Sequence, residues 1–441
     1  MKKYILIPII ILLFNSCQEV SEHKPLLTNS KEKQPIFIVN RNRHLNIPEF
    51  WIDQIKTPNK PIMTPKEIQE FNNQVAYSQK KLTYFRDINR YYGASWVKSS
   101  IENNYKEMIV RAKYFEDDNR ISAEFYSQIK DDMNLESIST DKVKTRYALT
   151  VNFTDQKLIP TDLALLKRKR EIYFDRNQNS ALDIATPIAI LHSTDDGEWH
   201  YGITPTSSGW VKDTDIAFGD KKEIEQYLSS QNFIVTTEPK SALMVAGKYY
   251  DYLRMGVRLP SLLTVDEMTM VLIPSRDNKG NLVMKNASIK TSSTHKGYLP
   301  YTPQNILTQA FKFINTPYGW GGSFGEQDCS KFLQEVYASV GIKLPRNSTD
   351  QSLVGSQQTE LTPLTKESKR VLLKTLPIGA TILHLKGHIT LYIGEYKGEP
   401  YIIHTVWGES KRHFALGRTA VTALEFNGYI DKVDRATIVL E

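Results

Sequence analysis

The sequence predicts an α+β protein of several domains, and three observations lead to this prediction. The chain has 441 residues, and at roughly 150 residues per domain about three domains are expected. Helical patterning before residue 140 gives way to short β runs between about 143 and 292. After residue 295, helix patterns precede long alternating strands.

The composition is that of an ordinary globular protein. Hydrophobic residues make up 40% and charged residues 24%, which excludes a disordered, collagen-like or multi-spanning membrane chain. Lys and Arg number 56 against 49 Asp and Glu, a net charge of +7. This mild excess favours a polyanionic surface such as a cell wall, and we expect no nucleic-acid partner. Two cysteines exclude a disulfide scaffold.

Residues 1–16 have the layout of a secretory signal. Basic Met1–Lys3 precedes an apolar run, Tyr4–Phe14, which is shorter than the roughly 20 residues that span a bilayer. Cys17 follows a small residue, which resembles a bacterial lipoprotein signal with a lipidated cysteine. Phe14 and Asn15 depart from that pattern, so ordinary secretion is the alternative. We expect a lipid anchor at Cys17 and a cell-envelope location, on the outer-membrane or periplasmic face in a Gram-negative cell.

Three regions are expected between the signal and residue 295. Residues 17–46 are polar and read as a tether, and residues 47–140 as a helical N-terminal clip. Short strands at 141–220 end in Gly-Trp-Val and resemble a bacterial SH3-like domain, a small β-barrel. Residues 221–294 predict a second such barrel. The basic run Lys167–Arg170 is either a solvated loop or a contact with anionic wall polymer.

Residues 295–441 contain a candidate nucleophile. A glycine-rich loop, Pro317–Gly322, leads to Asp328 and Cys329, and a helical pattern follows. Cys329 is therefore expected at a helix N-terminus, where the dipole and free N–H groups stabilise a thiolate. The alternative is a buried structural thiol.

Two histidines are placed to serve that thiolate. His388 opens an alternating strand, and residues 401–406 form the expected return strand. A hairpin that pairs Glu395 with Glu399 sets His404 diagonal to His388 on one face. A base and the group that orients it need this adjacency.

The motifs PYGWGG, DCS, LPRNSTDQ, GHITLYIG and YIIHTVWG together resemble the NlpC-type papain-like cell-wall peptidases, over the whole of residues 295–441. The resemblance implies a papain-like catalytic domain with a Cys329, His388 and His404 triad. It also implies cleavage of the γ-D-glutamyl–diamino acid bond in peptidoglycan stem peptides, in the subgroup that needs a free N-terminal L-Ala.

The resemblance further implies substrate contacts. Asp328 would hold the ammonium group, Ser330 and Ser348 would line the dipeptide pocket, and Tyr318 would lie near the nucleophile. Relatives also use an acid and an aromatic residue of the first SH3-like domain. The tyrosine expected before its Gly-Trp is replaced by Ser207-Ser208, so that contact does not transfer.

Each of these residues also has a structural interpretation. Asp328 is a possible helix cap, Ser330 and Ser348 possible turn or capping residues, and Tyr318 a possible core residue. His384 matches no family position and is read as structural.

We therefore expect a monomeric thiol peptidase with peptidoglycan stem peptides as substrate, no cofactor and no metal, since no metal-ligand motif occurs. Two alternatives stay open. One is an N-acetylmuramoyl-L-alanine amidase, and the other is a non-catalytic cell-wall-binding lipoprotein.

Overall fold

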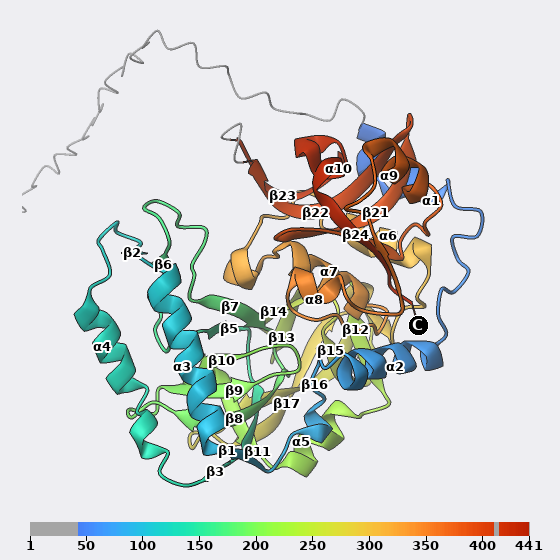
Figure 1. Ribbon diagram of the computed structural model, residues 1–441. Coiled ribbons are helices and arrows are strands. Elements are labelled where there is room, and N and C mark those ends of the chain that lie inside the picture. The colour runs from blue at the N-terminus through green and yellow to red at the C-terminus, as the bar shows by residue number, and fades with distance from the viewer. Residues whose placement is uncertain (1–42, 410–413, 441) are drawn as a thin grey trace, which may run out of the picture. The chain divides into compact units, whose positions relative to one another are not determined.

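The computed structural model describes residues 43–409 and 414–440 (Figure 1). The predicted signal, Cys17 and nearly all of the tether lie outside these residues. Three antiparallel sheets of seven, seven and six strands follow one another along the described chain. None of the described helices is both long and apolar enough to cross a membrane.

The N-terminal segment is helical, as predicted. Thr64 caps α2 by accepting from the Glu67 backbone N–H, and the Glu67 carboxylate accepts from the Thr64 N–H, which completes a capping box. The elements are η1 (Arg43–Asn46), α1 (Pro48–Ile52), α2 (Pro65–Asn73), η2 (Gln74–Ser78), η3 (Phe85–Asp87), β1 (Tyr91–Gly93), α3 (Ala94–Arg111), β2 (Tyr114–Phe115), α4 (Ala123–Asp132) and η4 (Leu135–Ser137).

This segment contacts two different regions. In its first half, Asn72 donates its side-chain amide to Gly341 O and accepts from Lys343 N, which ties α2 to the C-terminal region. In its second half, α3 lies beside the first sheet, and β2 pairs with β6 (Figure 1). The segment therefore clips two parts of the chain together.

The first sheet has the strand order β11-β4-β8-β9-β10-β5-β7. The predicted strand Trp199–Ile203 is found as β9. The strands of this region are β3 (Lys142–Lys144), β4 (Arg146–Thr150), β5 (Thr154–Lys157), β6 (Leu165–Leu166), β7 (Gln178–Leu182), β8 (Pro187–Ser193), β9, β10 (Ser208–Lys212) and β11 (Ile216–Gly219), with η5 at Asp213–Asp215.

The second sheet has the order β14-β13-β17-β16-β15-β12-β18. The predicted hairpin turn lies between β16 and β17, and Gly280 supplies the positive φ of +83° that it requires. The elements are α5 (Lys221–Leu228), β12 (Phe233–Thr236), β13 (Lys240–Val245), β14 (Lys248–Arg254), β15 (Arg258–Val265), β16 (Met268–Arg276), β17 (Leu282–Lys290), η6 (Thr291–Ser293) and β18 (Thr294–Lys296).

The third sheet has the order β19-β24-β20-β21-β22-β23 and belongs to the C-terminal region. Its elements are α6 (Pro303–Phe311), η7 (Trp320–Gly325), α7 (Cys329–Ala338), α8 (Ser348–Gln351), β19 (Gln357–Glu360), α9 (Lys366–Leu373), β20 (Thr381–Leu385), β21 (His388–Tyr396), β22 (Glu399–Glu409), β23 (Phe414–Ala423), η8 (Phe426–Gly428), α10 (Tyr429–Lys432) and β24 (Val433–Ile438).

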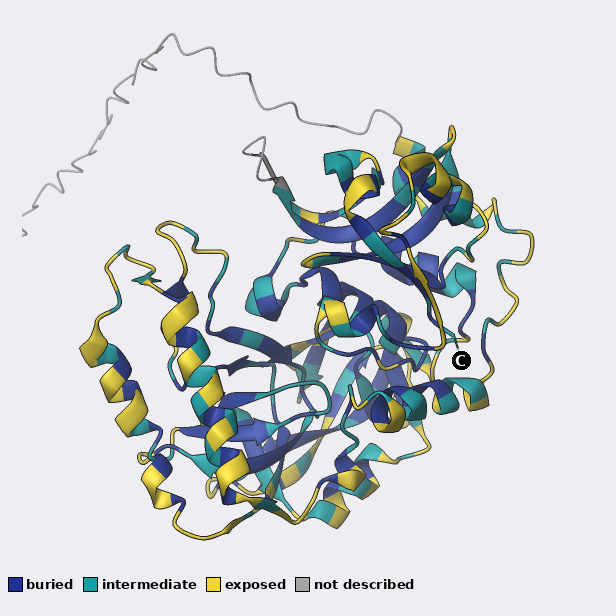
Figure 2. Cartoon of the chain, viewed as in Figure 1, coloured by how far each residue is buried: buried dark blue, intermediate teal, exposed yellow. Residues whose placement is uncertain are grey.

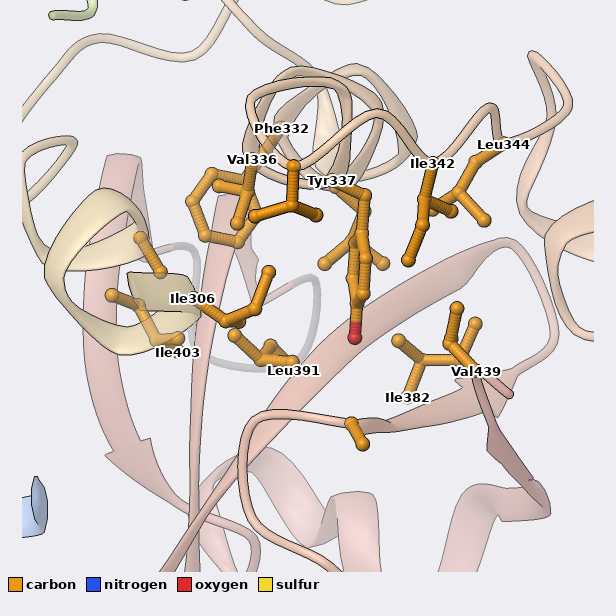
Figure 3. Close-up of a cluster of buried hydrophobic side chains, with 14 of the residues drawn as sticks. Ile306, Phe332, Val336, Tyr337, Ile342, Leu344, Ile382, Leu391, Ile403 and Val439 are labelled. Carbon is orange, nitrogen blue, oxygen red and sulfur yellow. The ribbon is translucent and has the colours of Figure 1, made fainter. Parts of the chain in front are cut away.

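The core that positions α7 lies between this helix and the third sheet. Phe332, Val336 and Tyr337 of α7 meet Leu391 and Ile403 of the sheet (Figure 3). All five are fully buried, and each apolar side chain contributes about 1.5–3 kcal/mol by leaving water. The inner strands β20 and β21 of this sheet are largely buried in Figure 2, whereas α4 carries many exposed residues. The start of α7 is therefore held firmly against β21.

Candidate functional site

Cys329 is the first residue of α7, as the sequence predicts. Asp328 is the N-cap, and its Oδ1 accepts from the backbone N–H groups of Ser330 and Lys331 at 3.1 and 2.8 Å. The cysteine side chain belongs to the apolar core, and the residue is only 8% exposed.

The surroundings of Cys329 act against the thiolate that the helix start favours. Burial and, to a smaller extent, the nearby Asp328 carboxylate raise the pKa of the thiol to about 12. Hydrogen bonds from the Ile389 and Ser330 N–H groups act in the opposite direction, but they do not outweigh these two effects. At neutral pH the resting group is therefore a thiol, and its ionisation needs a base.

The two histidines meet across adjacent strands. His388 Nε2 lies 2.8 Å from His404 Nδ1. The expected pairing of Glu395 with Glu399 is wrong by one residue, because Tyr396 pairs with Glu399. An irregularity between Tyr392 and Gly394 absorbs the extra residue, so that the predicted adjacency of the histidines is nevertheless found.

Both imidazoles are neutral at physiological pH. Burial lowers the pKa of His388 to about 4, although the Asp328 charge opposes the shift. Burial and the neighbouring His388 hold the pKa of the fully buried His404 well below its usual value. Since Nε2 of His388 faces His404, Nδ1 is the nitrogen left to act on a thiol.

Two further polar groups lie near this pair. Thr422 Oγ1 on β23 lies 3.1 Å from His404 Nε2, a contact that the sequence reasoning missed. The sequence does show a hydroxyl residue on the strand after His404. Its contact with His404 could be predicted only with the register between these two strands, which the sequence reasoning did not address. His384 Nδ1 lies 2.7 Å from Asp434 Oδ1, in agreement with its structural interpretation.

On the other side of Cys329, the polar groups are charged. Arg346, which sequence reasoning also missed, places Nη2 2.7 Å from Asp328 Oδ2. Burial opposes the ionisation of Asp328, but Arg346 holds the pKa of the carboxyl below its usual value. Arg346 also donates to Ser330 Oγ and to Ser180 Oγ of β7.

The Asp328 carboxylate thus already has protein partners on both oxygens. Oδ1 also accepts from Ser330 Oγ, and Oδ2 also accepts from Gly321 N. A carboxylate has about four acceptor positions in all. The capping interpretation of Asp328 is therefore confirmed, whereas its contact with a substrate ammonium stays a prediction.

The remaining predicted residues are less enclosed. Tyr318 is partly buried, and its ring lies 5.9 Å from that of Trp407 and 6.2 Å from that of Phe174. Burial, with the nearby Asp328 and Cys329, raises its pKa well above the usual value. Ser348 is the first residue of α8, and no hydrogen bond to its hydroxyl is found among the described residues.

The glycine-rich loop packs against the first sheet. Gly321 and Gly322 have φ of +64° and +89°. A Cβ on Gly321 would lie 2.6 Å from Gln178 Cγ, and one on Gly322 would lie 2.5 Å from the Ala181 Cβ. Both glycines therefore permit the close approach of β7 to η7.

The segment between β6 and β7 forms a wall beside Tyr318. Tyr173 packs on Trp407 at 4.5 Å between ring centroids, and the Arg176 guanidinium lies 4.9 Å from the Trp320 ring. Asp118 of the N-terminal segment accepts from Arg170 N at 2.8 Å and braces this loop. The first sheet thus reaches the site through the segment 171–181.

The second sheet contacts α7 through buried charges. Arg254 at the end of β14 pairs with Asp183, and Lys331 lies 3.5 Å from the same carboxylate. Glu335, one turn along α7, is 3% exposed. Burial raises its pKa to about 8, so that it is largely protonated at neutral pH.

Comparison with known proteins agrees with the resemblance inferred from the sequence. Residues 315–413 match the family described as NlpC/P60, and residues 166–212 match an SH3 domain of the SH3b1 type. The chain therefore carries an NlpC/P60 domain and, before it, an SH3-like domain. The second SH3-like domain and the lipid anchor remain predictions.

Two curated relatives and one solved structure are informative. A γ-D-glutamyl-L-lysine dipeptidyl-peptidase from Bacillus cereus is 26% identical over 179 residues, which are 36% of this chain and 50% of the relative. The bifunctional muramidase/DL-endopeptidase CwlT of Bacillus subtilis is 40% identical over 50 residues, 11% of this chain and 15% of that protein. This chain thus spans half or less of the length of these relatives.

The solved structure is described as a novel NlpC/P60 endopeptidase from Photobacterium damselae subsp. piscicida. It is 21% identical, and the match covers 88% of this chain and 96% of that chain, with a TM-score of 0.72. At this identity the likeness shows a shared fold across nearly all of both chains.

Proposed function

We propose that this chain is a cysteine endopeptidase of peptidoglycan, which hydrolyses the γ-D-glutamyl–diamino acid bond of stem peptides with a free N-terminal L-Ala. The observation that carries the proposal is the His388–His404 contact on the strands that pack against the Cys329 helix. The family match and the activity for which the Bacillus cereus relative is named support the choice of bond.

The reaction starts from a neutral thiol and a neutral imidazole. His388 Nδ1 takes the Sγ proton as sulfur attacks the γ-carbonyl carbon. The backbone N–H of Cys329 stabilises the resulting oxyanion, since Asp328 accepts from the N–H groups of Ser330 and Lys331. When the C–N bond breaks, His388 returns the proton to the leaving amine. Water activated by the same nitrogen then releases the acyl group and restores the thiol.

The free-amine requirement needs a carboxylate for the substrate ammonium. Asp328 already pairs with Arg346 and caps the helix, so we propose that Glu171, which itself pairs with Arg168 and Arg176, adds a second negative charge to that of Asp328 at the ammonium. Its Oε1 accepts from Arg168 at 3.0 Å, whereas its buried Oε2 makes no hydrogen bond within the described residues and lies 3.7 Å from Arg176 Nη2. Ser330, Ser348 and Tyr318 would line the same end of the cleft.

A digest of defined peptides tests the bond and the end group together. The tripeptide L-Ala-γ-D-Glu-diamino acid is expected to give free L-Ala-γ-D-Glu by mass spectrometry, whereas its N-acetylated form resists. Equal cleavage of both forms contradicts the free-amine requirement. Release of an intact stem from a muropeptide identifies an amidase, and binding without cleavage identifies a wall-binding protein.

Glu171→Gln sharpens this test. It removes the charge and keeps the shape, so kcat/KM on the free-amine tripeptide is expected to fall about tenfold or more. The matched control is Glu198→Gln, an exposed carboxylate in the turn before β9, which should leave kcat/KM unchanged. Equal activity of the two variants would remove Glu171 from the substrate site.

We also propose attachment to the envelope through a lipid on Cys17, a residue outside the described part of the chain. Cys17→Ser is expected to move the protein from the membrane pellet to the soluble fraction, because lipid transfer needs the thiol. A variant that still pellets with membranes contradicts the anchor. The proposed domains are the signal 1–16, tether 17–46, clip 47–140, SH3-like domains 141–220 and 221–294, and peptidase 295–441.

A further inference from the structure

A row of three polar side chains crosses the third sheet next to the nucleophile. His388, His404 and Thr422 lie on the neighbouring strands β21, β22 and β23. His404 pairs with Ala420, so Thr422 is its diagonal neighbour on the same face. The contacts are 2.8 Å from His388 Nε2 to His404 Nδ1, and 3.1 Å from His404 Nε2 to Thr422 Oγ1.

His404, the central residue of this row, carries a single ring proton, which can be on either nitrogen. His404 is fully buried and neutral, so either Nε2 or Nδ1 carries its proton, and the other nitrogen accepts. A proton on Nε2 is donated to Thr422, and Nδ1 then accepts from His388. A proton on Nδ1 is donated to His388, and Nε2 then accepts from the Thr422 hydroxyl.

Only the first arrangement leaves His388 able to act as a base. If His404 Nδ1 accepts, the single proton of neutral His388 is on Nε2, and its Nδ1 has a free lone pair for the Cys329 thiol. If His404 Nδ1 donates, the His388 proton must be on Nδ1, and no lone pair faces the thiol. The tautomer of His404 therefore decides whether the base works.

We propose that Thr422 is a positioning residue, whose hydroxyl oxygen accepts the Nε2 proton of His404 and thereby keeps His404 Nδ1 as the acceptor for His388. The catalytic meaning of this arrangement rests on the proposed function, but the tautomer itself does not. Without the hydroxyl, the Nε2–H donor would be buried and unpaired, which disfavours this tautomer.

The test is a measurement of the ring-nitrogen resonances of ¹⁵N-histidine-labelled full-length protein, assigned with a His404→Asn variant. In the wild type, His404 is expected to be protonated at Nε2. Thr422→Val should shift the population toward Nδ1–H, and Thr422→Ser should restore the wild-type tautomer. The matched control is Thr405→Val, which removes another buried hydroxyl of the sheet that contacts Thr419 and not His404.

Steady-state kinetics on the cleaved tripeptide gives the second readout. Thr422→Val is expected to lower kcat roughly tenfold to a hundredfold with little change in KM, the effect of one lost buried hydrogen bond on the base. Thr422→Ser should recover most of kcat, and Thr405→Val should keep it.

Three results overturn the proposal. They are a wild-type His404 protonated at Nδ1, a Thr422→Val protein that keeps the wild-type tautomer, and a shifted tautomer with unchanged kcat. If the wild type cleaves no peptide, the proposed function fails, while the resonances still decide where the His404 proton lies.

Discussion

The two sides of Cys329 are built by opposite means. On the sheet side, His388, His404 and Thr422 form a neutral row within one sheet. On the other side, buried ionisable groups join α7 to both other sheets. We call this the ionic side and define it as Asp328, Arg346, Lys331, Glu335, Asp183 and Arg254. Strand pairing fixes the first side, whereas contacts between domains assemble the second.

This difference assigns the proton transfers to the sheet side and structural support to the ionic side. Neutral imidazoles can accept and return a proton during a reaction, and the lowered pKa of His388 favours the prompt return of that proton. Buried ion pairs resist such change, since removing one partner leaves the other charge uncompensated. We therefore expect substitutions on the sheet side to affect turnover, and those on the ionic side to affect stability first.

The largest effect is expected for the groups that exchange the proton. Cys329→Ala should lower kcat/KM more than about a thousandfold with a nearly unchanged unfolding free energy, because alanine suits a helix start. His388→Ala should be nearly as severe, and His404→Ala milder, since His404 acts through His388. Kinetics and urea unfolding on the same samples check this ranking, and more than a few per cent residual activity in Cys329→Ala contradicts the nucleophile.

The next effect should appear in stability rather than turnover. Arg346→Gln leaves the Asp328 carboxylate buried without its cation, at a cost of about 3 kcal/mol in the free energy of unfolding. Asp328→Asn keeps a capping side chain but strands Arg346, so it should not be silent, as it would be if capping were its only role.

A double-mutant cycle measures this coupling. The double variant Asp328→Asn/Arg346→Gln should lose clearly less than the sum of the two single losses. The control is Lys106→Gln, which breaks the exposed Glu102–Lys106 pair and should cost less than about 0.5 kcal/mol. Strict additivity would mean that the ionic side is no more coupled than the surface.

The smallest effect concerns Glu335 and depends on pH. Its pKa is raised from 4.5 to about 8 in the fold, so the folded chain holds a proton that the unfolded chain has lost, and stability falls as pH rises through this window. Between pH 6 and 7.5 this loss is about 2 kcal/mol. Glu335→Gln should remove that part of the slope, as urea unfolding at both pH values would reveal, and a variant with the wild-type slope contradicts the shift.

The sequence predicted the sheet side better than the ionic side, for a physical reason. Capping at Asp328 and alternation around His388 and His404 are local patterns, and they located the thiol and the imidazole pair. The hairpin was wrong by one residue, because a strand irregularity leaves no clear sequence signal. Arg346 was missed because one of its partners, Ser180, lies 166 residues away, and the raised pKa of the Cys329 thiol was missed because desolvation depends on packing.

The glycines of η7 bear on whether the peptidase is a detachable module. Gly321 and Gly322 lie in close contact with Gln178 and Ala181. The conformation of the loop that precedes the nucleophile therefore depends on packing against a neighbouring domain. A fragment that begins at residue 295 would lose that packing surface and also the Ser180 hydroxyl of β7, which accepts from Arg346. A peptidase domain transferred between related enzymes should therefore stay active only when the matching first sheet is transferred with it.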